Sequence, residues 1–367
     1  MNQFISKWRR LHHPSMDVSG DVAFFYQLYA RLHAIIGQES RRYCESEILR
    51  LVLYTENIIA IGLDGVYEYR YRSVGDVVCH WCNKWQLPVN ATSQINRLVN
   101  QAVADAPCSS LRRWMMESIL SGNFQWLSGM LTYLAREDKV LRLALPDLRF
   151  RRAMFRQLTG NRQTARQMLW ADIAFNWQDK RGFSLSAAIA DRLRHPFPTI
   201  NGQEQALLKE AADALATLRP ERLDTYTVIG RKDSPTLTLR HRDGRVFENV
   251  VLNEESDYLA AQLVTYLGKT YINGPAVWLD SKEVENWNGE RVWNDIINKE
   301  QEAARQRHFI TAFGKRICLY EDLYTIPADP DEARDAEWGI YPDEPDILDF
   351  MEWLKPGEAV DKVFCFR

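Results

Sequence analysis

DTYTVIGRKDSPTLTLRHRDGRVFENVVL, residues 224–252, is the stretch that decides the fold class. Apolar and polar residues alternate along 225–230 and along 236–240, and β-branched residues are frequent along 246–252. A period of two is typical of half-buried strands, and the Asp243-Gly244 pair favours a tight hairpin between the last two segments. We therefore expect short antiparallel strands after residue 220.

Upstream of this stretch the apolar spacing is helical from about residue 21 to residue 218. Phe25, Leu28, Leu32 and Ile36, for example, recur at the three- and four-residue spacing that lays one apolar stripe along a helix. Several short helices follow, each bounded by glycine, proline or a capping residue. The sequence thus predicts an α+β fold, with an N-terminal multi-helix array (about 21–218) followed by a mixed C-terminal domain that contains β-hairpins.

We place the domain boundary after residue 219. Residues 1–219 are expected to form a basic all-helical domain, and residues 220–367 an acidic α+β domain with short antiparallel strands. Within the second domain the patterns predict a helix over about 256–267 and a short strand over 276–279. They also predict a charged helix over about 291–307, and a second hairpin at Gly314-Lys315 between segments 309–313 and 316–320.

The composition is that of an ordinary folded protein. Of the 367 residues, 46% are hydrophobic and 26% are charged, and the 12 Trp, 15 Tyr and 15 Phe supply enough apolar area for a large core. The best candidate for a membrane span, residues 48–63, is interrupted by Arg50, Glu56 and Asn57. With no apolar run after the basic N-terminus and only six cysteines, we expect a soluble cytoplasmic protein with reduced thiols and no membrane partner.

Charge is distributed unevenly along the chain. Residues 1–200 hold 26 Lys and Arg against 17 Asp and Glu, whereas residues 201–367 hold 20 against 32. The basic part could face nucleic acid or another polyanion, or the two parts could attract each other across a contact. An evenly solvated surface is the third interpretation.

The candidate nucleic-acid-binding segment reads RFRRAMFRQLTGNRQTARQMLW, residues 149–170, and contains no acidic residue. Two helices around a Thr-Gly-Asn turn would resemble a helix-turn-helix, whose second helix presents side chains to base edges. The candidate contact residues are Arg149, Arg151, Arg152, Arg156, Arg162, Gln163 and Arg166. Two positions depart from the compact motif, because Arg156 stands where a small residue is wanted and Arg166 where an apolar one is. The alternative is a solvated cationic face, or one that docks on the acidic part of the chain.

Cys79-His80-Trp81-Cys82 is the one pair of cysteines with the spacing of a redox or metal motif. A redox dithiol needs its first thiol at a helix N-terminus, whereas this pair lies inside a predicted helix. A zinc site needs further ligands, and no second pair follows. We therefore treat Cys79 and Cys82 as weak metal candidates that are expected to pack as small apolar side chains, and no pattern predicts a cofactor.

The chain carries no strong catalytic motif. His241-Arg242-Asp243 matches a kinase catalytic-loop tripeptide, but the asparagine and the glycine-rich loop that accompany it are absent, so we interpret it as part of a hairpin turn. Two hypotheses follow. The first is a non-enzymatic binding or regulatory protein whose basic helical surface contacts nucleic acid or a protein partner. The alternative is an enzyme whose active site lies in a cleft between the two domains, with an unknown reaction.

Overall fold

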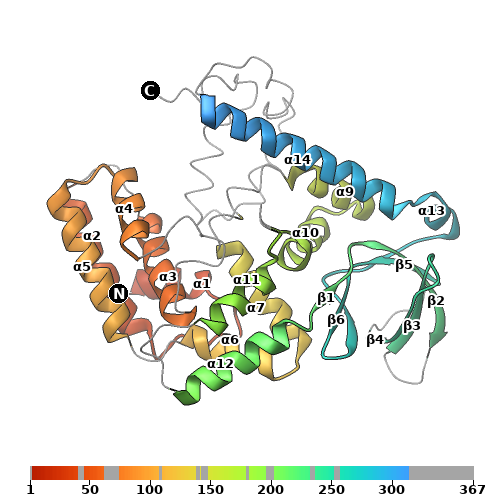
Figure 1. The fold of residues 1–367 in the computed structure, drawn as a ribbon, viewed down its shortest axis with the longest axis horizontal. Helices are drawn as coiled ribbons and strands as arrows, with labels where there is room; N and C mark the ends of the chain where they lie inside the picture. The colour runs from red at the N-terminus through yellow and green to blue at the C-terminus, as the bar shows by residue number, and fades with distance from the viewer. Residues whose placement is uncertain are drawn as a thin grey trace. The chain divides into compact units, whose positions relative to one another are not determined.

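The computed structural model describes residues 2–39, 45–61, 74–106, 110–137, 141, 148–178, 182–195, 202–231, 236–251 and 257–313. Helices come first along the chain and strands follow, so the predicted α+β class with a helical N-terminal part is confirmed (Figure 1). The chain divides into two compact units. The first comprises Met1–Leu141 and Gln167–Trp287, and the second comprises Arg142–Arg166 and Asn288–Arg367. The predicted boundary after residue 219 stays a prediction.

Most helices belong to the first unit. They are α1 (Asn2–Leu11), α2 (Val22–Glu39), α3 (Glu45–Ile61), α4 (Val74–Lys84), α5 (Val89–Asp105), α6 (Ser110–Leu120), α7 (Phe124–Glu137), all but the first turns of α10 (Arg162–Asn176), α11 (Leu185–Arg194), α12 (Gly202–Leu215) and α13 (Ser281–Asn286). The predicted stripe of α2 is confirmed, because Phe25, Leu28, Leu32 and Ile36 are all buried. Among the described helices, none combines the length and the apolar character that crossing a membrane requires.

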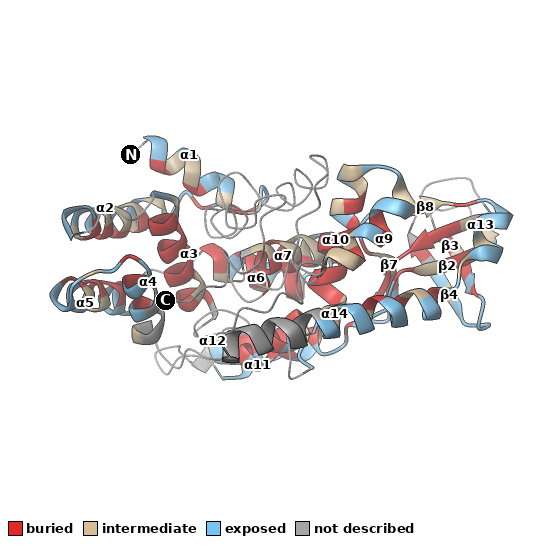
Figure 2. Cartoon of the chain, turned by 90° about the horizontal axis from the view of Figure 1, so that it is seen from above, coloured by how far each residue is buried: buried red, intermediate tan, exposed pale blue. Residues whose placement is uncertain are grey.

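Helix α3 is buried along almost its whole length, as the colouring of Figure 2 shows. Its polar side chains therefore need partners inside the protein. Glu47 accepts a hydrogen bond from Trp85 Nε1 at 2.6 Å and pairs with Lys84 Nζ at 2.7 Å. Glu56 Oε2 lies 2.6 Å from Nε2 of the buried His12 imidazole, so one of the two carboxylate oxygens has a hydrogen-bonding partner there. These contacts join α1 and α4 to α3.

The strands of the first unit form one sheet with the order β1-β6-β7-β4-β3-β2-β5-β8. They are β1 (Arg219–Pro220), β2 (Asp224–Arg231), β3 (Thr236–His241), β4 (Val246–Val251), β5 (Tyr258–Ala261), β6 (Leu263–Tyr266), β7 (Lys269–Ile272) and β8 (Val277–Trp278). All neighbours are antiparallel except β4 and β7, which are parallel. The predicted hairpin at Asp243-Gly244 is confirmed, since β3 and β4 pair across it.

The two ends of this sheet are joined through the chain itself. β5 and β6 are consecutive, with only Gln262 between them, and β5 pairs with β2 while β6 pairs with β1 and β7. The sheet therefore closes on itself through the segment Tyr258–Tyr266. Its interior is a cluster of buried apolar side chains, namely Tyr226, Leu237, Leu239, Val250, Leu259, Ala261 and Leu263.

The helix predicted over about 256–267 is wrong, because this segment forms β5 and β6. Leu259, Ala261 and Leu263 point into the interior of the sheet. Residues on the other face are covered as well, since Gln262 donates to the carbonyl oxygen of Met168 at 2.9 Å and Tyr266 donates to that of Ile119. A strand buried on both faces loses the alternation by which strands are recognised.

The described part of the second unit consists of α9 (Arg149–Thr159), the start of α10 and α14 (Gly289–Phe313). Phe155 of α9 packs against Trp293 of α14, with ring centroids 6.4 Å apart. The strand predicted over 309–313 is wrong, because α14 continues through Phe313. The rest of that predicted hairpin, residues 314–320, lies outside the described residues.

Candidate functional site

Two short helices meet at a turn inside the arginine-rich segment. α9 ends at Thr159, and Gly160 follows with a φ of 60°, donating its N–H to the carbonyl oxygen of Arg156 at 3.0 Å. Glycine adopts this left-handed conformation without strain, so it ends the helix cleanly. Asn161 then starts α10, because its Oδ1 accepts a hydrogen bond from the N–H of Thr164 at 2.9 Å. The predicted pair of helices joined by a turn is confirmed.

Arg151 lies on the buried face of α9 and is only 6% exposed. Its Nη2 lies 2.7 Å from Glu300 Oε2 and its Nε lies 3.1 Å from Glu300 Oε1, so the guanidinium holds the carboxylate with two bonds. The guanidinium carbon also lies 5.4 Å from the centre of the Trp293 ring. Planar pairing through two hydrogen bonds fixes the orientation of both side chains. Arg151 therefore joins α9 to α14 and is poorly placed to reach a phosphate.

The other candidate side chains lie nearer to the surface. Arg156 and Gln163 are exposed, and the half-buried members of the set are Arg149, Arg152, Arg162 and Arg166. In α10 the buried face begins at Ala165 and continues with Met168 and Leu169, and in the first turn Gln163 is exposed while Arg162 and Thr164 are half-buried.

This arrangement concentrates positive charge at the start of a helix. Residues 149–170 contain six arginines and no carboxylate. The first N–H groups of α10 add the partial positive charge of a helix N-terminus beside Arg162. Guanidinium groups bind phosphate oxygens with two hydrogen bonds, so the chemistry available here is anion recognition.

Cys79 and Cys82 lie on α4, as the sequence predicted, but the structure places them in different environments. Cys79 is exposed and Cys82 is buried, and both thiols are free. Burial raises the pKa of the Cys82 thiol to about 11, with a smaller contribution from Cys79, and a hydrogen bond with Thr92 only partly opposes this shift. A reactive redox thiol needs a lowered pKa, which Cys82 does not have. No group of three or more His, Cys, Asp or Glu side chains among the described residues is placed to hold a metal ion.

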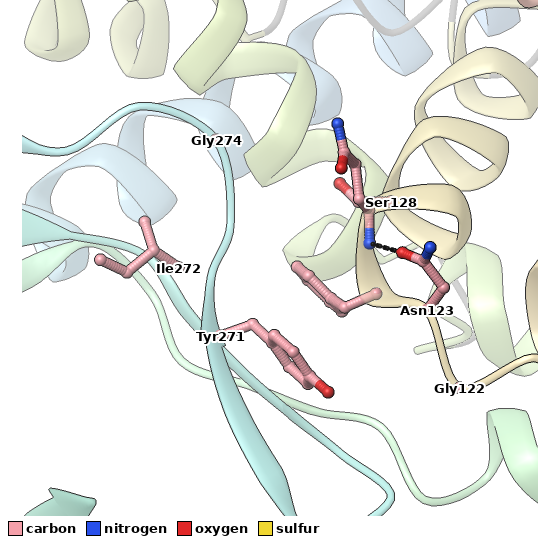
Figure 3. A pocket seen from close by; sticks show the side chains of 8 residues that line it. Gly122, Asn123, Ser128, Tyr271, Ile272 and Gly274 are labelled. Carbon is pink, nitrogen blue, oxygen red and sulfur yellow. Dashed lines mark hydrogen bonds between the residues drawn. The ribbon is translucent and has the colours of Figure 1, made fainter. Parts of the chain in front are cut away.

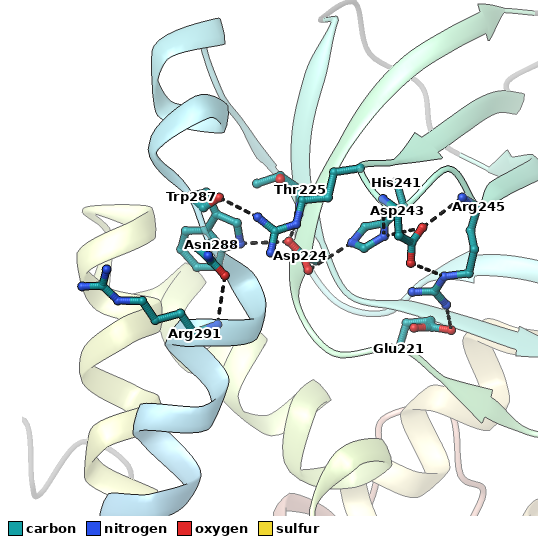
Figure 4. A network of polar contacts seen from close by, with 10 residues as sticks. Glu221, Asp224, Thr225, His241, Asp243, Arg245, Trp287, Asn288 and Arg291 are labelled. Atoms are coloured by element: carbon teal, nitrogen blue, oxygen red, sulfur yellow. Dashed lines mark hydrogen bonds and ion pairs between the residues drawn. The ribbon is translucent and has the colours of Figure 1, made fainter.

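His241 lies at the end of β3, next to the hairpin turn, and both of its ring nitrogens face carboxylates (Figure 4). Nε2 lies 3.1 Å from Asp224 Oδ2, and Nδ1 lies 2.8 Å from Asp243 Oδ1. Trp287 Nε1 donates to the other oxygen of Asp224 at 3.0 Å. The imidazole therefore links the start of β2 to the hairpin turn after β3, and we call this arrangement the His241 clamp.

The hairpin turn is held by a second set of polar contacts. Arg245 Nε lies 2.7 Å from Asp243 Oδ2, and its Nη1 lies 2.6 Å from Glu221 Oε1. Although partial burial alone would raise the pKa of Asp243, hydrogen bonds from the Arg245 N–H, His241 and the Arg245 side chain hold that pKa well below its usual value. Burial raises the pKa of the neighbouring Tyr226, and Asp224 raises it further.

Sequence reasoning found the turn at Asp243-Gly244 but missed the contact of His241 with Asp224. The signal is the register of the β2–β3 pair, in which Tyr226 stands opposite His241. Asp224, two residues before Tyr226, therefore points to the same face near the end of β3. The register of a hairpin depends on where each strand ends and the connecting loop begins, and the sequence pattern does not give these positions for β2 and β3.

Comparison of this chain with known protein families, with curated proteins and with solved structures finds no match.

Proposed function

We propose that this protein is a non-enzymatic nucleic-acid-binding protein that uses the surface of α9 and the first turn of α10. The observation that carries the proposal is the capped turn at Gly160 and Asn161, which brings an arginine-rich helix and the N-terminus of a second helix together at the surface. Phosphate groups are the ligands that such a combination favours. A protein partner with an acidic surface is the second candidate of this class.

The proposal assigns different tasks to the side chains. Arg162 and Gln163, in the first turn of α10, are the candidates for contact with base edges, because the second helix of such a pair enters the major groove with its N-terminal residues. Arg152, Arg156 and Arg166 are assigned to phosphate groups. Arg151 keeps α9 seated on α14 and acts only through that packing.

The experiment is a titration of a fluorescein-labelled 20-base-pair DNA duplex with the full chain, followed by fluorescence anisotropy over a range of KCl concentrations. Because each phosphate contact releases condensed counterions, the affinity should fall steeply as salt rises. Replacing Arg156 and Arg166 together by Ala should lower the slope of log affinity against log salt by about 2, one for each lost phosphate contact.

A matched control variant tests whether binding depends on this particular surface or only on the net charge of the protein. Arg97 and Lys209 are exposed on α5 and α12, and replacing both by Ala removes the same two positive charges. We expect this control to bind as the unaltered protein does. Equal losses in the two double variants, or an absence of salt-sensitive binding by the unaltered chain, would refute the proposal. Tight binding to an acidic protein, without affinity for the duplex, would favour the second candidate.

The enzyme alternative stays a hypothesis. No contact described above favours it, and both ring nitrogens of His241 face carboxylates.

A further inference from the structure

The first unit contains a pocket of about 440 Å³ between the turn that precedes α7 and the end of strand β7. Figure 3 shows Asn123 and Ser128 on the helical side, and Tyr271 and Ile272 on the strand side. The residues that line it are Gly122, Asn123, Phe124, Gln125, Ser128, Tyr271, Ile272 and Gly274. The volume lies within the range of about 300–1,000 Å³ that is typical of small-molecule sites.

The strand side of the pocket is fixed by buried polar contacts. Asn273 is fully buried, its Nδ2 donates to the carbonyl oxygen of Ala171 at 3.0 Å, and its Oδ1 lies 3.3 Å from Ser128 Oγ. At Gly274, with a φ of 77°, an added Cβ would lie 2.9 Å from the Cβ of Ala171. Glycine is required here because the chain both adopts a left-handed conformation and passes close to α10. The pocket is therefore preformed on packed elements.

One wall is aromatic. The rings of Phe124 and Tyr271 stack with their centroids 4.6 Å apart and an angle of 10° between their planes. Phe124 is 7% exposed and serves as the floor for the half-buried Tyr271. A flat apolar surface of this kind accepts the C–H face of a ring or the face of another aromatic group.

The opposite side offers neutral hydrogen-bonding groups. Asn123 Oδ1 accepts from the N–H of Gln125 at 3.0 Å, which leaves the two N–H groups of its amide for a ligand. The side-chain amide of Gln125 is exposed and supplies both donors and an acceptor. Ser128 Oγ retains acceptor capacity beside its contact with Asn273.

None of the eight lining residues carries a charged side chain. A charged ligand would have to leave water without an opposite charge to meet it, which is costly. Hydroxyl groups both donate and accept, so they match side-chain amides and a serine hydroxyl, and a sugar ring also has an apolar face that suits an aromatic wall. We propose that this pocket binds a neutral polyhydroxylated small molecule, a mono- or disaccharide.

The test is ligand-observed saturation-transfer NMR on the full chain with four probes: glucose, N-acetylglucosamine, maltose and cellobiose. Each probe is titrated to about 20 mM, above the dissociation constant of about 1 mM expected for a few neutral contacts. We expect saturable transfer from at least one probe. Gln125→Ala should weaken that binding about fivefold through the loss of one net hydrogen bond, and Tyr271→Ala should weaken it further by removing the wall. Tyr271→Phe, which retains the stacked ring, should lose less affinity for the saccharide than Tyr271→Ala.

The matched control is Gln94→Ala, the same substitution at an exposed position of α5 in the same unit. It should leave the titration unchanged. Absence of saturable transfer from all four probes would overturn the proposal, as would equal effects of Gln94→Ala and Gln125→Ala. Displacement of the bound saccharide by inorganic phosphate would also overturn it, since it would assign the pocket to an anion. The outcome is independent of the duplex titration, because none of the lining residues belongs to α9 or α10.

Discussion

Two ion-pair networks in this protein use the same chemistry in different surroundings. In the α9–α14 contact, the side chains of Arg151 and Glu300 are 7% and 12% exposed and lie against an indole ring. At the β3–β4 hairpin, the side chains of Arg245 and Asp243 are 48% and 42% exposed. Water weakens the second pair and not the first, so burial determines how much each contributes to stability.

The largest expected effect is that of Arg151→Ala. Removing the guanidinium takes from the nearly buried Glu300 carboxylate both of the charge-assisted hydrogen bonds that Arg151 makes, which costs about 3–5 kcal/mol. Amide hydrogen exchange resolved by peptide should show the loss of protection in α9 and α14. The control is Gln157→Ala, an exposed position on the same helix, which should change the opening free energy by less than about 0.5 kcal/mol.

The double variant Arg151→Met, Glu300→Leu sharpens this comparison. Apolar replacement of a whole buried pair is often neutral or stabilising, so protection should return to near its original level. A double variant as unprotected as Arg151→Ala would show that the pair itself, rather than the stranded carboxylate, sets the stability of this contact.

An intermediate effect is expected for His241→Ala. The imidazole joins Asp224 to Asp243, and its loss removes the contact of one oxygen of each carboxylate with a ring nitrogen. We expect a loss of about 1–2 kcal/mol, observed as faster amide exchange in β2 and β3. His241→Gln, which retains a hydrogen-bond donor, should lose less stability than His241→Ala. If both variants exchange alike, the clamp contributes nothing beyond packing.

The smallest effect is expected at the exposed turn and depends on pH. Since the pKa of Asp243 is lower in the folded protein than in the unfolded chain, its contribution to stability is fully present above the unfolded value of about 4. That contribution is lost as pH falls from about 4 through the folded value. Asp243→Asn should remove this part of the acid dependence, and about 1 M KCl should reduce the difference between the two proteins near neutral pH. Acid unfolding curves identical in both proteins would contradict the assignment.

The sequence predicted those parts of the fold in which one face of an element meets water. The stripe of α2, the turn of β3 and β4 and the two helices around Gly160 all carry a local signal of period or of turn chemistry. Segment 258–266 was mistaken for a helix because both of its faces are covered, which hides the period of a strand.

The candidate site was predictable only in part. The run of arginines was visible in the sequence. Which of them forms a buried ion pair was not, because Glu300, with which Arg151 pairs, is 149 residues away along the chain. The pocket was not predictable at all. It combines Gln125 and Ser128 with Tyr271 and Gly274, which are brought together by the packing of β7 against helices that are remote in the sequence.

The closure of the sheet through Tyr258–Tyr266 has a consequence for self-association. This segment combines high β propensity with no charged residue, which is the profile of a strand that seeds aggregates. In the folded protein its backbone pairs on both sides, with β2 and β8 along one half and with β1 and β7 along the other. The two strands left at the margins, β1 and β8, are only two residues long. This segment therefore offers another chain little free strand edge on which to assemble.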